Sequence, residues 1–391
     1  MPCMDTANFQ KTRVLVLCGA RSTEHEVSLV SAYNIVKAID KSKYEVFVVG
    51  IDKQGYWRQY SPNDFVINAE QGVGKVYLSD NHLSGRLAVS QSSNDIYDID
   101  NNKIALTCDV IFPAVLGSYA EDGLMQGLIR MMDVPFTTSD VLGSAVGFDK
   151  DISYRLLKEA GLPVAKFITV RKGLSIPTYD ETVASVESNT LFVKPANAGS
   201  SVGVSKVTDQ NSLDQALELA LSYDTKVVIQ AAVVGREVEI SVTGNIGKMK
   251  TSVIGEVIEK DANDFYSYEN KYINSSNVEL SIPADISHDL VEKISATAIR
   301  VCEVLECEGF GRVDFFIDRQ DVIYINEINT MPGFTATSMF PRLWRESGVN
   351  YTELIDWLIR LAVERYENRV KPIVTDAGDI IKISNSIRAK Y

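Results

Sequence analysis

Two carboxylates and an amide, Asp314, Glu327 and Asn329, lie close together in the chain, and Arg312 precedes them. Carboxylate and amide oxygens are ligands that a hard cation such as Mg²⁺ prefers, and substrate phosphates often complete its coordination shell. If these side chains project from one rigid face, they can hold a metal ion against a phosphate group. An ordinary amphipathic hairpin with a charged solvent face explains the same residues equally well, so this stretch alone leaves both interpretations open.

These side chains fall on two expected strands, which a tight polar turn centred on Arg319-Gln320 joins. That turn pairs Arg312 with Glu327 and Asp314 with Ile325. Paired side chains share a face of a sheet, so the polar groups are expected together on one face. The other face is expected to pack into a core, and it consists of Val313, Phe315, Ile317, Val322, Tyr324 and Ile328. A register slip of one residue would scatter the polar cluster.

A loop of small residues, 197–203, follows an apolar strand that ends at Lys194. Its glycines permit close backbone approach, and Ser200 and Ser201 add hydroxyl donors, so the loop can cover phosphates. It matches neither the GxxxxGK[ST] pattern of a P-loop nor the strand–GxGxxG–helix context of a dinucleotide fold. Lys150 and Lys194 could supply positive charge to a nucleotide. Taken singly, a flexible hairpin tip and solvated surface lysines are the simpler interpretations.

An acidic segment opens the first expected helix, where Ser22 precedes Glu24. A serine followed by acidic residues in the first turn is a good helix cap, so the structural interpretation is strong. The segment also lies at the carboxyl end of the first strand, where open α/β sheets bind ligands. Glu24 could there pair with the ammonium group of a substrate.

Two further segments could complete a site. In a polar loop, Lys271 could meet an anion and Tyr272 could close a lid that excludes water. Beyond the hairpin, the Gly333 N–H could donate to a developing oxyanion with Arg312 as its charged partner, and Ser338 could bind a substrate carboxylate. A plain surface loop and a plain Pro-Gly turn are the alternatives.

The length and composition of the whole chain limit the kinds of protein it can be. At 391 residues, 45% apolar and 23% charged, it is expected to be a globular protein of two or three domains. A net charge of −13 with no long basic run disfavours a nucleic-acid or anionic-membrane partner. Five cysteines without a CxxC pair and three scattered histidines disfavour a disulfide framework, a zinc site and histidine-based catalysis. No signal sequence or membrane-spanning apolar run is visible, so the protein is expected to be cytoplasmic.

Three regions follow one another along the chain. Residues 1–139 alternate buried strands with helices, as in an open parallel α/β sheet, and contain a polar, irregular insertion at 63–103. Residues 140–235 form a smaller α+β unit, in which one helix is expected to begin behind Ser212 as its N-cap. Residues 236–391 contain further strands, a long helix and the hairpin. The expected fold class is therefore a multidomain mixture of α/β and α+β.

Taken in order, the motifs resemble those of the D-alanine–D-alanine ligase family of the ATP-grasp superfamily, from about Val14 to Ala362. The matching stretches are 24–28, 121–123, 149–150, 194–195 with 199–203, 236–239, 268–272, 311–314 and 327–334. The last of them is the most specific. The resemblance implies an ATP-grasp fold, in which the three regions are an N-terminal open parallel α/β domain, a central ATP-grasp subdomain and a C-terminal subdomain with the lid loop and the metal site.

The resemblance also implies a reaction. Members of the family couple ATP cleavage to peptide-bond formation between two D-alanines, for the peptidoglycan precursor of the cell wall. The first D-alanine carboxylate takes the γ-phosphoryl group, and the amine of the second D-alanine then displaces phosphate from the acyl phosphate. Such chemistry needs mainly positioning and charge neutralisation, which agrees with the residue types found above. The expected partners are D-alanine and ATP, with no nucleic acid or membrane, and the protein is expected to be a homodimer.

By the same resemblance, several residues receive binding roles. Asp314, Glu327 and Asn329 are expected to bind two Mg²⁺ or Mn²⁺ ions. The second substrate's carboxylate is expected at Ser338 and Lys271. The expected ATP-binding residues, with Glu237 at the ribose, are Lys150, Lys194, Ser201, Gln230, Glu237 and Lys271.

The remaining roles concern the first substrate and the lid. Glu24 is expected to anchor the ammonium group of the first substrate. Ser200 and Tyr272 are expected to link with Glu24 and so hold the lid shut. Arg312 and the Gly333 N–H are expected to stabilise the tetrahedral oxyanion.

The chain departs from the family pattern at several positions. Leu116 stands before Gly117 where the family usually has a histidine near the first substrate, which leaves the identity of that substrate open. Ala20 and Ala120 replace glycines, and Gln230 replaces a glutamate that commonly contacts the adenine amino group. Glutamine keeps a carbonyl acceptor, so ATP use is expected to persist. Two alternatives to D-alanine ligation remain: the same chemistry on another amino acid such as D-serine, or a non-catalytic ATP-binding relative.

Overall fold

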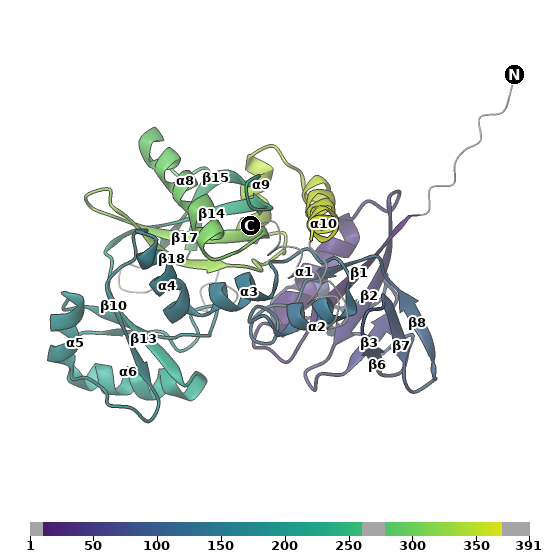
Figure 1. Ribbon diagram of the computed structural model, residues 1–391, viewed down its shortest axis with the longest axis horizontal. Helices are drawn as coiled ribbons and strands as arrows, with labels where there is room; N and C mark the ends of the chain where they lie inside the picture. The colour runs from purple at the N-terminus through teal and green to yellow at the C-terminus, as the bar shows by residue number, and fades with distance from the viewer. Residues whose placement is uncertain (1–10, 260–277, 370–391) are drawn as a thin grey trace, which may run out of the picture.

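The structure of the protein, a computed structural model, describes residues 11–259 and 278–369 (Figure 1). Among these residues, the strands form three larger sheets and two small ones. The N-terminal sheet lies to the right in Figure 1, the central sheet at the lower left and a five-stranded sheet above it, with α3 (Val141–Phe148) and α4 (Lys150–Glu159) at their junction. The expected multidomain mixture of α/β and α+β is confirmed.

The N-terminal sheet has the strand order β3–β2–β1–β9 and is covered on both faces. Its elements are β1 (Thr12–Gly19), α1 (His25–Ala38), β2 (Tyr44–Ile51), β3 (Trp57–Tyr60), β9 (Val110–Pro113) and α2 (Leu124–Met132), together with the C-terminal helix α10 (Tyr351–Asn368). β1 runs parallel to β2 and β9. Val14 and Val16 pack beneath α1 and α10, whereas Leu15 and Leu17 pack against α2. An unbroken apolar run is what a strand buried on both faces requires.

The insertion at 63–103 is more regular than the sequence predicts. It contains β4 (Val66–Ile67), η1 (Ala69–Gln71), η2 (Val73–Lys75), β5 (Tyr77–Leu78), β6 (Leu87–Val89) and β7 (Asp95–Asp98), and β8 (Lys103–Thr107) follows. β6, β7 and β8 form an antiparallel sheet, so the prediction of an irregular insertion is wrong. These strands are only three to five residues long, too short for an alternating pattern to be read reliably.

The central sheet is antiparallel with the order β10–β13–β11–β12. Its elements are β10 (Phe167–Arg171), α5 (Tyr179–Val186), β11 (Leu191–Pro195), β12 (Ser205–Val207), α6 (Gln210–Tyr223) and β13 (Lys226–Ala231). Asp209 rather than Ser212 is the N-cap of α6, so the predicted cap is wrong. The Asp209 carboxylate accepts from the Ser212 N–H at 2.8 Å, and the Ser212 hydroxyl accepts from the Asp209 N–H at 3.1 Å. This is a reciprocal capping box, which a search for a single cap residue misses.

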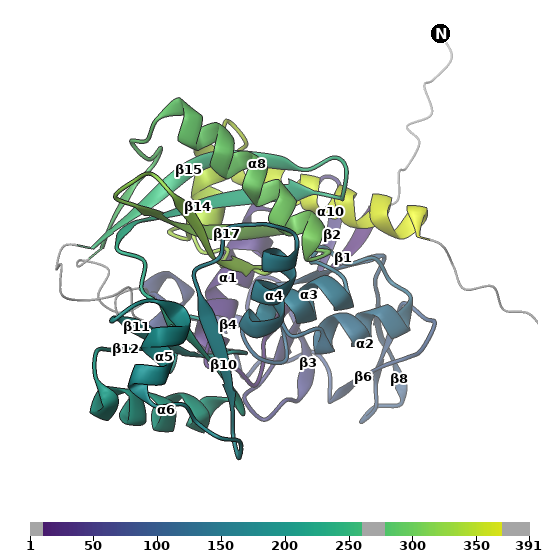
Figure 2. The same cartoon turned by 60° about the vertical axis from the view of Figure 1, so that its left-hand side comes forward.

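The five-stranded antiparallel sheet has the order β16–β15–β14–β17–β18. The elements of this region are β14 (Gly235–Gly244), β15 (Lys250–Glu259), β16 (Val278–Ser281), α8 (His288–Val304), β17 (Gly309–Asp318), β18 (Ile323–Asn329) and α9 (Met339–Glu346). α8 covers one face, over Val238, Val313 and Phe315. Figure 2 shows α8 on the outside of this sheet, away from the central sheet. The face opposite α8 is therefore the one turned toward the central sheet.

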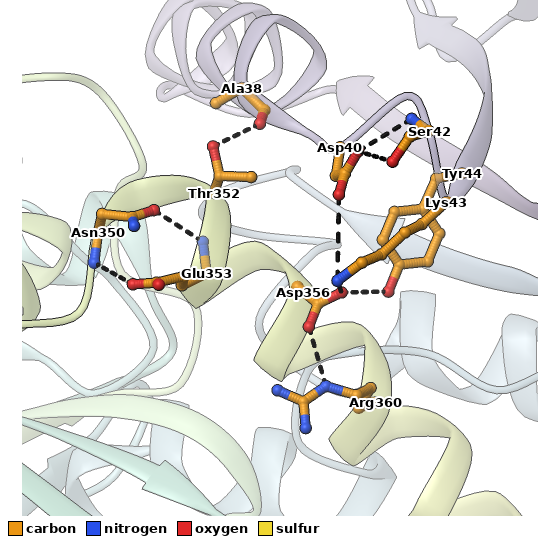
Figure 3. A network of polar contacts seen from close by, with 10 residues as sticks. All are labelled: Ala38, Asp40, Ser42, Lys43, Tyr44, Asn350, Thr352, Glu353, Asp356 and Arg360. Atoms are coloured by element: carbon orange, nitrogen blue, oxygen red, sulfur yellow. Dashed lines mark hydrogen bonds and ion pairs between the residues drawn. The ribbon is translucent and has the colours of Figure 1, made fainter.

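The C-terminal helix α10 ties the last region of the chain to the N-terminal domain (Figure 3). The Thr352 hydroxyl donates to the Ala38 carbonyl at 2.8 Å. Asp356 accepts from the Lys43 ammonium at 3.0 Å and from the Tyr44 hydroxyl at 2.9 Å. One apolar core joins the two regions, and its aromatic side chains include Phe112, Phe310, Phe334, Phe340 and Trp344. The N-terminal domain and the five-stranded region are therefore packed together.

Two expectations from the sequence concern disulfides and membranes. The described cysteines, Cys18, Cys108, Cys302 and Cys307, are buried and free, which confirms the prediction of buried thiols for these four. No helix within residues 11–259 and 278–369 has the length and apolar character needed to cross a bilayer.

Candidate active site

The hairpin of β17 and β18 forms as expected, but in a different register. Arg312 pairs with Asn329, and Asp314 pairs with Glu327, so the predicted pairing is wrong. A β-bulge follows these pairs and leaves Asn326 as the extra residue on β18. A residue count outward from the turn cannot detect such an unpaired residue. The four polar side chains nevertheless share one face, which confirms that part of the prediction.

The bulge also changes which side chains of β18 are buried. Ile323 and Ile325 belong to the core, each only 1% exposed. Tyr324 instead pairs with Phe316 and lines a cavity on the other face. Val322 lies in the turn and is 39% exposed. The prediction that Val322 and Tyr324 pack into the core is therefore wrong, because the extra residue reverses the alternation of faces.

Three carboxylates form a row across neighbouring strands. Glu239 of β14 pairs with Asp314 of β17, which in turn pairs with Glu327 of β18. Glu239 and Asp314 are both buried. Sequence reasoning gave Glu239 no role, because nothing in the hairpin indicates which distant strand lies beside it. The available signal was its spacing of two residues from Glu237, which places both side chains on one face of a strand.

Arg312 pairs with two acids of this row, Glu239 and Asp314. Its Nε and Nη2 donate to the two carboxylate oxygens of Asp314, each at 2.7 Å. Its Nε also lies 2.8 Å from Glu239 Oε2. The Asn329 amide donates to Asp314 Oδ2 at 3.0 Å. Because two-pronged arginine–carboxylate bonds are strong and directional, Arg312 and Asp314 fix one another's orientation.

The donor set of this face suits a hard divalent cation. Asp314, Glu327 and Asn329 bring two carboxylates and an amide together on adjacent strands. In the described ranges 11–259 and 278–369, no group of three or more His, Cys, Asp or Glu side chains is arranged to hold a metal ion. Mg²⁺ in nucleotide sites commonly uses one or two carboxylates, with phosphate oxygens and water completing its shell. These residues therefore fit an ion that binds together with a nucleotide.

A cavity of about 500 Å³ lies between the central sheet and the five-stranded sheet. Its volume falls within the roughly 300–1,000 Å³ typical of small-molecule sites. Its apolar walls include Ala165, Phe192, Val257, Phe316, Tyr324 and Ile325. The residues predicted to bind ATP that line it are Lys150, Lys194, Ser201, Gln230 and Glu237.

Two lysines in this cavity are buried rather than solvated. Lys194 Nζ donates to Gln230 Oε1 at 3.0 Å and to Oδ1 of the bulge residue Asn326 at 3.1 Å. Lys150 Nζ lies 3.1 Å from Glu327 Oε2. Each lysine is 8% exposed, so the interpretation of these residues as surface lysines is wrong. Burial strengthens the attraction of both ammonium groups for an anion.

A second cavity, of about 290 Å³, adjoins the first, and both are lined by Lys150, Ala198 and Glu327. Other residues with predicted roles that line it are Glu24, Ser200, Arg312, Asn329, Gly333 and Ser338. A group leaving a nucleotide in the larger cavity would therefore pass Lys150 and Glu327 into the smaller one. The smaller cavity contains both acidic and basic side chains, which suits a zwitterionic ligand.

The start of α1 contacts the loop of residues 197–203, the glycine loop, in the second cavity. The Ser200 hydroxyl donates to the Glu24 carboxylate. Ser200 and Ser201 both have left-handed backbone conformations, with φ of 51° and 58°. Glu24 itself precedes the first helical residue, and no side chain caps the helix. The interpretation of Ser22 as the helix cap is therefore wrong; its hydroxyl instead accepts from the Glu24 N–H at 3.1 Å.

A second acid, Glu121, lies beside Glu24. It accepts a hydrogen bond from the Gly117 N–H at 2.8 Å. Burial and the neighbouring Glu24 carboxylate raise the pKa of Glu121 well above the usual range of a glutamate. Glu121 therefore favours its protonated form more strongly than an ordinary glutamate does.

Gly117 and Leu116 form the wall next to these acids. Gly117 has φ +79°, and a Cβ there would lie 2.3 Å from Ser22 Oγ and 2.8 Å from Glu24 Oε2. Only glycine fits at this position without displacing Glu24. Leu116 is 5% exposed and lines the second cavity. It presents an apolar side chain where the family pattern has a histidine.

The turn after β18 closes the second cavity. The Phe334 N–H donates to Ser31 Oγ of α1 at 3.1 Å, and the Phe334 carbonyl accepts from the Tyr351 hydroxyl at 2.5 Å. Ser338 is the N-cap residue of α9. A Cβ at Gly333 would lie 2.9 Å from Ser338 Oγ. These contacts anchor the backbone of the turn beside the first helix.

Two predicted site residues, Lys271 and Tyr272, lie outside the described residues together with the rest of the expected lid. Their roles stay predictions. All the other residues predicted to act in the site lie within the described ranges, and Asp314 sits between Arg312 and Asn329 on the strand face that borders the cavities.

Two family models match this chain. The model described as D-ala D-ala ligase N-terminus matches residues 13–139, and the one described as D-ala D-ala ligase C-terminus matches residues 156–360. A D-alanine–D-alanine ligase of Shouchella clausii is 44% identical over 357 residues, which cover 91% of this chain and 96% of the relative. D-alanine–D-alanine ligase A of Escherichia coli K12 is 43% identical over 361 residues, which cover 92% of this chain and 97% of the relative.

Solved structures show the same architecture. The D-alanine-D-alanine ligase from Coxiella burnetii has a TM-score of 0.76 at 29% identity and covers 96% of this chain and 100% of its own. The VanG D-Ala:D-Ser ligase from Enterococcus faecalis also has a TM-score of 0.76, at 30% identity, and covers 90% of this chain and 100% of its own. The nucleotide-sized cavity between two antiparallel sheets and these neighbours define the ATP-grasp fold. The chain belongs to the D-alanine–D-alanine ligase family.

Proposed function

We propose that this protein is a ligase that joins two D-alanines into D-alanyl-D-alanine, with cleavage of ATP, for peptidoglycan precursor synthesis. The observation that carries the proposal is the junction of the two cavities at Lys150 and Glu327. A nucleotide in the larger cavity can there transfer its terminal phosphoryl group to an amino acid in the smaller one. Family membership and the names of the curated relatives support the same conclusion.

In the first step, the carboxylate of one D-alanine attacks the γ-phosphorus of ATP. The bond from that phosphorus to the β–γ bridging oxygen breaks, so ADP leaves and an acyl phosphate forms. Lys150 and Lys194 supply positive charge to the phosphates, while Ser201, Gln230 and Glu237 bind other parts of the nucleotide. Glu24, oriented by Ser200, binds the ammonium group of the amino acid.

Asp314, Glu327 and Asn329 would hold two divalent cations, Mg²⁺ or Mn²⁺, against the nucleotide phosphates. When bound, such ions neutralise phosphate charge and orient the transferred group. Arg312 and Lys150, which pair with these acids, can then turn toward substrate oxygens.

In the second step, the amine of the second D-alanine attacks the acyl carbon, and phosphate leaves the resulting tetrahedral intermediate. Arg312 and the Gly333 N–H stabilise its oxyanion. Ser338 and Lys271 bind the carboxylate of the second D-alanine. Tyr272 closes the lid, and the exclusion of water protects the acyl phosphate from hydrolysis.

The direct test incubates the protein with ATP, Mg²⁺ and D-alanine and measures released phosphate and dipeptide. The matched control is Asp314→Asn, which keeps the side-chain shape and one hydrogen-bonding oxygen but removes the charge. We expect phosphate and dipeptide in equal amounts from the wild type and a loss of at least about a hundredfold in the variant, because metal-assisted charge stabilisation supplies several kcal/mol. Wild-type release no greater than that of the variant would contradict the proposal.

A second candidate is the same chemistry with another amino acid. Leu116 motivates it, because an apolar side chain borders the acids that would bind the first substrate. One structural neighbour with this architecture, VanG from Enterococcus faecalis, is named a D-Ala:D-Ser ligase, which supports this candidate. A panel of D- and L-amino acids decides between the two, and a clear preference for a residue other than D-alanine selects the second. ATP binding measured by calorimetry, without turnover on any member of the panel, would instead indicate a non-catalytic relative.

We further propose the domain division 1–139, 140–235 and 236–391, a cytoplasmic location and a homodimer. The division is supported by the separate strand orders of the three sheets. Buried free thiols support a reducing compartment. The exposed apolar side chains Leu124, Met131 and Leu142 on α2 and α3 support a dimer contact. Light scattering of the purified protein tests the oligomeric state.

A further inference from the structure

A buried cation, Lys226, sits behind the nucleotide-binding residues. Its side chain is 7% exposed and forms an ion pair with Asp149. Its Nζ also lies 3.5 Å from Asp151 Oδ2, and the Asp151 side chain has no exposed surface. The Thr169 hydroxyl donates to Asp151 at 2.6 Å, and Arg155 Nε lies 2.8 Å from the same carboxylate. Nothing in the proposed reaction uses this network.

Both acids of the network belong to the start of α4. Asp149 is the N-cap residue and accepts from the Ile152 N–H at 3.0 Å. Lys150, which borders both cavities, lies between Asp149 and Asp151 in the chain. Lys226 on β13 pairs with both acids, whereas Arg155 pairs with Asp151, so Asp149 depends on Lys226 for its compensating charge. Removal of one partner from a buried ion pair leaves an uncompensated charge, so the geometry of this turn depends on Lys226.

The backbone of Lys226 also supports the glycine loop. Its carbonyl accepts from the Ala196 N–H at 2.9 Å, and the Ala196 carbonyl accepts from the Lys150 N–H at 3.0 Å. The Lys150 ammonium then donates to the Ala198 carbonyl at 2.7 Å. The main chain of Lys150 is thus held by Ala196, which the backbone of Lys226 holds in turn, and its side chain is held by Ala198 of the following loop.

We propose that Lys226 is a positioning residue for nucleotide binding, which keeps Lys150 directed at the junction of the two cavities by neutralising Asp149 and Asp151. The inference rests on the proposed function only for the identity of the ligand. Lys226 is not among the described residues that line the two cavities. It therefore acts through Lys150 and not by direct contact with the nucleotide. Without Lys226, the uncompensated Asp149 carboxylate beside Lys150 would compete with the nucleotide for its ammonium group.

The experiment measures the affinity of the full-length protein for a non-hydrolysable ATP analogue with Mg²⁺ by calorimetry. We expect Lys226→Met to weaken binding by about tenfold or more, because small displacements of a positioning group have effects of this size or larger. Lys226→Arg should restore affinity to within about threefold, because a guanidinium also pairs with both acids. In the Lys226→Met background, Asp149→Asn should restore affinity, since asparagine caps a helix as well as aspartate does but carries no charge that competes for Lys150.

A double variant separates positioning from a general structural effect. In a Lys150→Met background, Lys226→Met should change affinity by less than about twofold, because both substitutions remove the same contact. The exposed Lys166–Glu187 pair, adjacent to β10, gives a control: Lys166→Met removes a lysine from the same unit and should leave affinity unchanged.

Unchanged affinity in Lys226→Met, or an equal loss with and without Lys150, overturns the inference. If Lys226→Met does not fold, Lys226→Gln, which removes the charge but keeps a hydrogen-bond donor, takes its place in both backgrounds. A wild-type protein that binds the analogue but forms no dipeptide contradicts the proposed function and leaves this test intact. A wild-type protein that does not bind the analogue overturns both.

Discussion

The Arg312 guanidinium bonds both carboxylate oxygens of Asp314, each at 2.7 Å, on the face of β17 that borders the cavities. Lys150 pairs with Glu327 through a single contact, 3.1 Å from Nζ to Oε2. The two acids expected to bind metal are thus paired with the two cations expected to stabilise substrate charge. A metal ion has to compete with both cations, whereas a nucleotide phosphate can attract them away.

Metal affinity is therefore expected to depend on nucleotide. Mn²⁺ should bind the protein alone at least about tenfold more weakly than it binds the protein with a non-hydrolysable ATP analogue, because phosphate oxygens complete the shell and release the acids from their cations. The electron paramagnetic resonance signal of free Mn²⁺ measures both affinities. Equal affinities with and without the analogue would contradict this account of the site.

Glu239 shares Arg312 with Asp314, and its charge is expected to matter for the second step of the reaction. We expect Glu239→Gln to lower kcat by about tenfold and to leave KM for ATP within about twofold, because Arg312 stabilises the oxyanion and not the nucleotide. Steady-state kinetics with ATP and D-alanine measure both constants. Glu364→Gln, in an exposed pair with Lys248, is the control for loss of a glutamate charge. A rise in KM for ATP without a fall in kcat would assign Glu239 to nucleotide binding instead.

Gly117→Ala is expected to reduce kcat/KM for D-alanine by about a hundredfold, because a new Cβ would displace Glu24 from the substrate ammonium group. Gly173→Ala is the matched control. Gly173 has φ +83°, close to the +79° of Gly117, but no atom lies within 4 Å of a Cβ there. Both variants carry a similar backbone penalty, so the steric effect at Ser22 and Glu24 separates them. Similar activity in the two variants would refute the placement of Glu24.

Glu121 is expected to make stability depend on pH. Burial and Glu24 raise the pKa of Glu121 from 4.5 to about 8. Between these values the unfolded chain loses this proton and the folded protein keeps it, so the contribution of this group to stability falls as pH rises from 4.5 to about 8. Glu121→Gln mimics the protonated form and removes the effect. The midpoint of thermal unfolding should therefore be similar in wild type and variant near pH 5 and higher in the variant near pH 8.5, by roughly several degrees. A difference that is constant with pH would show that Glu121 is ionised when folded.

Ala20 is expected to destabilise the protein, because its φ of 112° is a conformation that only glycine adopts readily. Ala20→Gly should raise the free energy of unfolding by about 1 kcal/mol, the strain relieved being larger than the backbone entropy lost. Ala160→Gly, at a residue with φ −76°, should lower it. Denaturant unfolding measures both. A loss of stability at both positions would mean that Ala20 is not strained.

The sequence identified the polar face of the hairpin, because alternation along a strand is a local property that Arg312, Asp314 and Asn329 obey. It did not predict the register, because the bulge at Asn326 depends on how β18 meets its neighbours and not on the turn. The bulge matters for the site, since Asn326 directs its amide oxygen to Lys194.

Other residues of the site could not be predicted from the sequence because their roles depend on contacts with distant parts of the chain. Glu239 joins the carboxylate row only because β14 pairs with β17, and strand order is set by packing across the whole sheet. Glu121 became informative only when the structure placed it beside Glu24 and away from solvent. Lys226 lies at the start of an ordinary apolar strand, and only the fold places it against Asp149. Sequence motifs thus predicted the residues that would touch ligands better than those that support them.

The central sheet has its own apolar core, made only of residues between Ile168 and Ala231, whereas one of the cores of the five-stranded region, around Phe310 and Phe340, is shared with the N-terminal domain. The chain passes between these two bodies near Ala165 and Val233, and both residues line the nucleotide cavity. Release of ADP is then expected to be a hinge rotation of the central sheet about these two crossings. Because the glycine loop moves with that sheet, the same rotation would withdraw Ser200 from Glu24. Nucleotide exit and the loosening of the first substrate's anchor would then be a single motion.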